Sequence, residues 1–149
     1  MTYRFLCPNH RQWLQTHPAA ANAHFADTQD TGQWYREQGL WIQALPYMGC
    51  AYETAEIVLN LQAIDKATSV INFTSCAILL ADTWHKTGEY VNSREVLRCA
   101  QQRLVAEFAL CYQSPALQDC LSDCIKALAR GEQFEQELYL SPSVSRVKH

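Results

Sequence analysis

Long apolar segments and an excess of basic residues are both absent from this chain of 149 residues. No run reaches the roughly 18 consecutive apolar residues that a transmembrane helix requires, so we expect no membrane partner. Residues 1–8 lack the long apolar core of a secretion signal, which predicts a cytoplasmic location. The 12 Lys and Arg residues are outnumbered by 15 Asp and Glu residues. Nucleic-acid binding is therefore not expected, because it depends on a basic patch or stripe.

The motifs of common catalytic sites are missing as well. The sequence has no Gly-rich phosphate loop, no G-x-S-x-G turn and no H-E-x-x-H pair. Asp119 and Asp123 lie four residues apart, which places both carboxylates on one face of a helix, but such a pair usually belongs to an ordinary surface. We therefore predict a protein without catalytic residues and without a resident cofactor.

The composition is that of a compact domain, with a hydrophobic share of 48% and a charged share of 18%. A chain of this length buries roughly 68–70% of its unfolded surface, so folding needs no disulfide or metal. We expect one domain at residues 1–140 and a flexible tail at 141–149. The seven cysteines are scattered and odd in number, which fits a reducing compartment, and most are expected in the core. They are Cys7, Cys50, Cys76, Cys99, Cys111, Cys120 and Cys124.

Apolar residues recur at steps of three and four along the chain, which predicts an all-α fold with five to seven helices. The expected helices cover residues 11–15, 18–38 and 40–61, a segment from a cap at residue 65 to a turn at residue 88, then 89–112, 114–130 and 134–139. The run Asp27–Gly32 is a poor helix former, so a break into two shorter helices is the alternative there. The inner faces are expected to include Ile71, Ile78 and Phe108.

Short signals predict where these helices begin and end. Gly39 and Gly88 each separate two long amphipathic stretches, and Gly adopts the left-handed conformation that ends a helix at little cost. Asp65 is a suitable N-terminal cap, and Ser114 followed by Pro is a second start signal. Gly131 is expected to end the helix that begins there. The pattern predicts two helical hairpins in tandem, followed by further helices.

The two hairpins resemble the tetratricopeptide repeat, in which large, small and aromatic residues recur at fixed steps on paired helices. The residues that carry the resemblance in the second unit are Ala77, Leu80, Ala81, Trp84, Gly88, Tyr90, Ser93, Leu97 and Ala100. Those in the first unit are Gly32, Tyr35, Gly39, Trp41, Ala44, Met48 and Ala51. The two turns lie 49 residues apart, against about 34 in the family, and Glu56 and Val105 stand where a terminating Pro is expected. An ordinary antiparallel helical bundle is the alternative.

The resemblance implies a right-handed array whose first helices line a curved groove for a segment of another protein. The positions that would face the groove are Gln29, Gln33, Arg36 and Glu37 in the first unit, and Ser75, Ile78, Asp82, His85 and Lys86 in the second. Among these, Gln33, Arg36, Asp82, His85 and Lys86 are the predicted partner-binding residues. The carboxylate clamp of some family members is not reproduced, since Gln33 and Asp82 replace its Asn residues. We expect a scaffold, adaptor or chaperone, and self-association is left open.

A metal- or thiol-responsive protein is the alternative function. Cys7 and His10 are separated by two residues, and His17 and His24 follow at intervals of seven. Thiolate and imidazole are preferred zinc ligands, but a structural site normally needs four of them. Cys120 and Cys124 share a helix face and could bind a soft metal, although their apolar neighbours are typical of a core stripe.

Overall fold

The computed structural model describes residues 4–61 and 65–140. Within these two ranges the chain forms six helices and no strand, which confirms the all-α prediction. The helices are α1 (Pro8–Gln15), α2 (Pro18–Glu37), α3 (Trp41–Asn60), α4 (Lys66–Lys86), α5 (Tyr90–Leu110) and α6 (Pro115–Leu140). The predicted tail at 141–149 lies outside the described residues.

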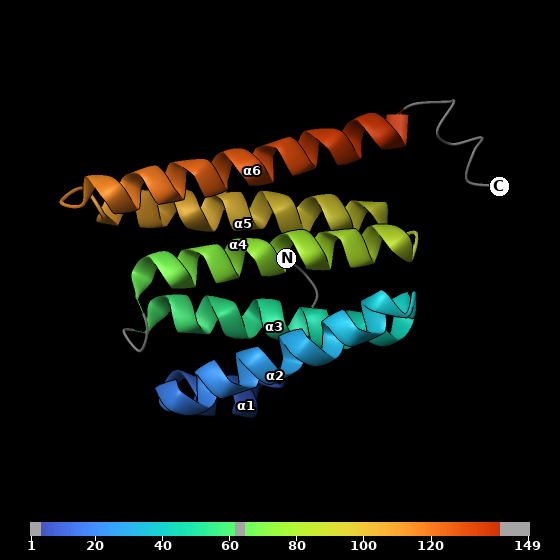
Figure 1. The fold of residues 1–149 in the computed structure, drawn as a ribbon, viewed down its shortest axis with the longest axis horizontal. Helices are drawn as coiled ribbons and strands as arrows, with labels where there is room; N and C mark the ends of the chain where they lie inside the picture. The colour runs from blue at the N-terminus through green and yellow to red at the C-terminus, as the bar shows by residue number, and fades with distance from the viewer. Residues whose placement is uncertain (1–3, 62–64, 141–149) are drawn as a thin grey trace.

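The five long helices form an array in chain order, each running opposite to the one before it (Figure 1). Consecutive helices pack against each other from α2 to α6, and α6 also packs against α4. The short helix α1 lies against α2 and α3. In the part of the chain that the structure describes, no helix combines the length and apolar character needed to cross a membrane.

The two predicted turns have the same hydrogen-bonding pattern. Gly39 and Gly88 have φ values of +72° and +85°. In the first turn, Gly39 N–H donates to Arg36 O (2.9 Å) and Leu40 N–H donates to Tyr35 O (2.9 Å). In the second turn, 49 residues later, Gly88 N–H donates to His85 O (3.0 Å) and Glu89 N–H donates to Trp84 O (2.9 Å). This pair of bonds is the Schellman motif. Both turns lie on the same side of the array, where α2 and α4 end and α3 and α5 begin (Figure 1).

The predicted helix starts are also present. The side chain of Asp65 accepts a hydrogen bond from Thr68 N–H at 3.1 Å, and Ser114 Oγ accepts one from Leu117 N–H at 3.4 Å. The first helix begins three residues earlier than predicted, at Pro8 instead of residue 11. Cys7 caps it, because its sulfur accepts a hydrogen bond from His10 N–H at 3.4 Å.

Helix α2 matches the predicted helix at residues 18–38 without the alternative break, whereas α6 is longer than the sequence pattern predicts. Helix α2 continues through the weak run Asp27–Gly32, where Gly32 is buried against α3 and a Cβ atom would overlap the Met48 side chain. This close packing of two helices outweighs the poor local propensity. Helix α6 does not end at Gly131, so the stop predicted there is wrong and the expected helix at 134–139 is its last part. Contacts beyond Gly131, such as Gln101 Nε2 to Glu132 Oε1 at 2.8 Å, hold the extension on the array.

The core lies along the middle of the array, where apolar residues of α3, α4, α5 and α6 meet. Trp84 is buried in it, as the hairpin pattern predicts. The inner positions assigned to Ile71, Ile78 and Phe108 are wrong, since these side chains are 51%, 41% and 38% exposed. Burial of the cysteines is also less complete than expected, because only Cys76 is fully buried. The predicted apolar stripes were therefore too wide, since one buried face of a helix covers only part of its circumference.

Candidate partner-binding surfaces

Arg36 and Asp82 come from α2 and α4 and lie together, as expected for two residues on one face. Arg36 Nη2 and Asp82 Oδ2 form an ion pair at 2.9 Å. Arg36 Nη1 also donates to Thr83 Oγ1 at 2.7 Å and to Leu79 O at 3.3 Å. Arg36 therefore braces the first helices of the two hairpins, and its charge is neutralised by Asp82.

His85 makes a similar link between α4 and α6. Its Nδ1 atom lies 2.6 Å from Glu135 Oε2, and both side chains are largely buried. Gln33, the remaining predicted residue of α2, is half-buried. Three of the five predicted partner-binding residues, Arg36, Asp82 and His85, thus take part in bonds that link α2 to α4 or α4 to α6.

Lys86 is the most accessible of the five predicted residues. Its Nζ atom lies 5.5 Å from the centroid of the Trp41 ring, and the guanidinium of Arg36 lies 5.4 Å from the same centroid. Cations at this distance are attracted by the negative face of an indole ring. Trp41 therefore joins the end of α4 to the start of α3.

Two adjoining cavities flank Lys86 beside the two Gly turns. One has a volume of about 340 Å³ and the other about 460 Å³. Lys86 and Thr87 line both of them. We name this surface the turn edge, which consists of residues 39–43, 85–88 and Tyr90. Leu40 and Ile42 are exposed on it. Their places one and three residues after the helix-ending Gly39 were the sequence signal that could have predicted it.

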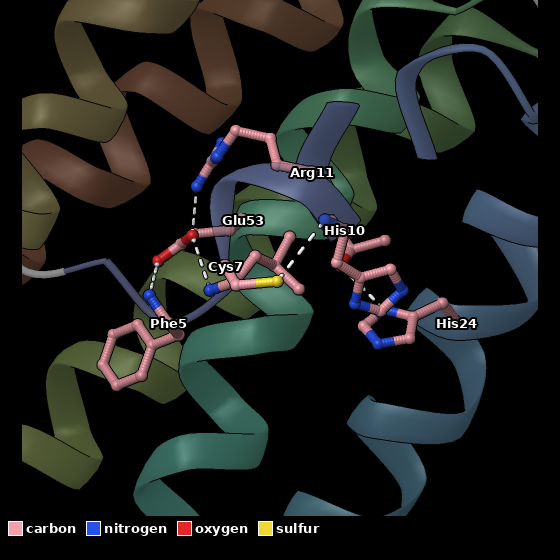
Figure 2. Close-up of polar contacts among 8 residues, drawn as sticks. Phe5, Cys7, His10, Arg11, His24 and Glu53 are labelled. Atoms are coloured by element: carbon pink, nitrogen blue, oxygen red, sulfur yellow. Dashed lines mark hydrogen bonds and ion pairs between the residues drawn. The ribbon is translucent and has the colours of Figure 1, made fainter. Parts of the chain in front are cut away.

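A second cluster lies where the segment before α1 meets α3 (Figure 2). Glu53 of α3 is only 2% exposed, and its carboxylate accepts hydrogen bonds from Phe5 N–H at 2.6 Å and from Leu6 N–H at 3.2 Å. Arg11 of α1 forms an ion pair with the same carboxylate. We name Phe5, Leu6, Arg11 and Glu53 the N-terminal clasp. Sequence reasoning missed it, although a Glu within the apolar stretch of α3 was a usable signal.

The Phe5 ring completes the attachment of this segment. It lies against Gly49 of α3, where a Cβ atom would overlap the ring. Its centroid is 6.2 Å from that of Trp84 in α4, within the range of favourable aromatic pairs. The segment before α1 thus reaches from α3 to α4 and is held by both polar and apolar contacts.

The histidines considered as zinc ligands under the alternative function lie in two separate places. The His10 and His24 rings meet edge to face at 4.8 Å, and His24 Nδ1 lies 2.9 Å from Thr54 Oγ1 (Figure 2). His17 instead stacks on Trp13, with ring centroids 4.2 Å apart. Burial, and then the neighbouring His10, lowers the pKa of His24. Across residues 4–61 and 65–140, no three His, Cys, Asp or Glu side chains are grouped to hold a metal ion.

The paired thiols Cys120 and Cys124 are half-buried and pack against the main core. Burial raises the pKa of Cys120, and the neighbouring Cys124 raises it further. Burial also raises the pKa of Cys76 to about 12. A reactive thiol needs a lowered pKa, so neither Cys76 nor Cys120 has the environment of one.

No family model, curated protein or solved structure matches this chain. The resemblance to the tetratricopeptide repeat therefore stays a prediction.

Proposed function

We propose that this protein is a non-enzymatic scaffold, acting as an adaptor or chaperone, that binds a segment of another protein at the turn edge. The observation that carries the proposal is the exposed Lys86, which lies over Trp41 and lines two adjoining cavities. A tetratricopeptide-like array is the architecture that we propose for this scaffold, because hairpin arrays present extended binding surfaces.

The chemistry of the turn edge favours an acidic segment with apolar neighbours. Lys86 is the only residue with a permanent charge among those that line the two cavities. The charge of Arg36 is already paired with Asp82, so Lys86 is the cation that attracts a carboxylate. Leu40 and Ile42, which are 38% and 76% exposed, supply apolar contact beside it.

We also propose a cytoplasmic location. All seven cysteines are free thiols, which is typical of proteins in a reducing compartment. The net charge of −3 supports a protein partner over a nucleic acid.

Affinity capture from a lysate of the source cells tests the proposal. Wild type is compared with Lys86→Glu and with a matched control, Arg130→Glu, which reverses an exposed charge on α6. We expect a partner that wild type and Arg130→Glu retain and that Lys86→Glu loses, with circular dichroism showing that all three are folded.

Equal retention by all three proteins would contradict a site at Lys86. Failure of every protein to retain a specific partner would contradict the scaffold function itself.

A further inference from the structure

An apolar groove lies between α5 and α6, at the opposite end of the array from α1. It has a volume of about 270 Å³ and is lined by Val105, Phe108, Ser122, Ile125 and Lys126. Val105 is 55% exposed and Phe108 is 38% exposed. Lys126 is the only charged residue in the lining.

Val105 and Phe108 lie three residues apart, so they share one face of α5. Two more large apolar side chains, Leu110 and Tyr112, are 74% and 71% exposed near the end of this helix. Exposed apolar patches of this kind are typical of an interaction site.

The charges beside the groove complement each other across a two-fold axis. Asp119, Ser122 and Lys126 follow at steps of three and four, so they share one face of α6. Neither Asp119 nor Lys126 forms an ion pair with another residue in the described ranges. If two α6 helices cross antiparallel near Ser122, Asp119 of each copy lies opposite Lys126 of the other, because a two-fold interface repeats each contact.

The size of the face also suits a second copy. Helix α5 has 21 residues and is therefore about 30 Å long, and two adjacent helices of about 10 Å width give a face of roughly 600 Å². Stable interfaces bury roughly 800 Å² per partner, which is of the same order.

We propose that the face of α5 and α6 is a homodimer interface, in which two copies pack antiparallel about a two-fold axis near Ser122. The apolar groove supplies the buried centre, and two reciprocal pairs between Asp119 and Lys126 fix the register. This interface is separate from the turn edge and does not depend on the proposed scaffold function.

Sedimentation velocity over a concentration series of the purified protein tests the interface. We expect a monomer–dimer equilibrium for wild type. Val105→Glu places a charge in the groove and should raise the dissociation constant at least about tenfold. Ile42→Glu, at an exposed position on the turn edge, is the matched control and should leave dimerisation unchanged.

A charge swap tests the two-fold register. Asp119→Lys and Lys126→Asp should each weaken the dimer, and the double variant should restore it. A monomer at all concentrations, or a dimer unaffected by Val105→Glu, would overturn the interface. Failure of the double variant to restore dimerisation would overturn the proposed register.

Discussion

The two ends of the array differ in how their apolar surface is covered. At the N-terminal end, the segment before α1 crosses α3, and Phe5 fills the space left by Gly49. At the C-terminal end, Val105 and Phe108 line a groove that stays open in the described structure. Both ends consist of the same element, a long antiparallel hairpin.

The difference shows how a short segment can close a helical array. Terminal units of such arrays need a cover, because each hairpin buries its apolar face only against a neighbour. The N-terminal end uses its own chain, fastened through the buried Glu53. We propose above that the C-terminal end uses a second copy.

Removing the carboxylate of the N-terminal clasp should have the largest effect. Glu53→Ala leaves two backbone N–H groups without their acceptor and Arg11 without its partner. We expect a loss of about 3 kcal/mol in the free energy of unfolding, measured by urea denaturation. Glu56→Ala, on the same helix and half-buried, is the control and should cost less than about 1 kcal/mol. A cost for Glu53→Ala no larger than that of the control would show that the clasp does not stabilise this end.

The same substitution at two glycines should have opposite effects at the two ends. Gly49→Ala places a methyl group against the Phe5 ring and should cost about 1–3 kcal/mol. Gly131→Ala lies inside α6, where the nearest atom is Leu97 Cδ1 at 3.5 Å, an ordinary contact. It should stabilise the protein by about 0.5–1 kcal/mol, because Ala is the better helix former. Thermal or urea denaturation of both variants checks the sign, and equal signs would contradict the comparison.

Acidification should weaken the N-terminal end, with the smallest of the three effects. The pKa of His24 lies below its ordinary value of 6.5 because of burial and the nearby His10. The unfolded chain therefore binds this proton at a higher pH than the folded chain does. The contribution of His24 to the free energy of unfolding is present above pH 6.5 and is lost as the pH falls below that value.

Urea denaturation at pH values on both sides of 6.5 measures this effect. His24→Gln should flatten the pH dependence relative to wild type. His17→Gln, whose ring stacks on Trp13 away from His24, should keep it. Identical pH profiles for wild type and His24→Gln would rule out the predicted contribution.

Local signals in the sequence predicted much of the fold. Gly39 and Gly88 require a positive φ, and Asp65 supplies a cap, so these helix ends depend on single residues. The stop predicted at Gly131 was wrong, and the alternative break at Asp27–Gly32 does not occur, because each Gly lies against a neighbouring helix. Packing between helices distant in sequence decides such cases, and local propensity does not contain it.

The candidate sites were less predictable than the fold. The pattern placed Arg36 and Asp82 on one face, but it could not show that they pair with each other. The N-terminal clasp depends on a contact between Phe5 and Glu53, 48 residues apart, which no periodic pattern encodes. Whether the predicted residues bind a partner stays a prediction.

The Gly turns have a consequence for how the turn edge can change during evolution. Each turn is held by backbone hydrogen bonds and by the positive φ of one Gly, so the neighbouring side chains are not needed to form it. Substitutions at Leu40 or Ile42 can therefore alter what the surface recognises while the hairpin is inherited intact. Gly39 determines that the turn forms, and its neighbours Leu40 and Ile42 determine what the surface binds.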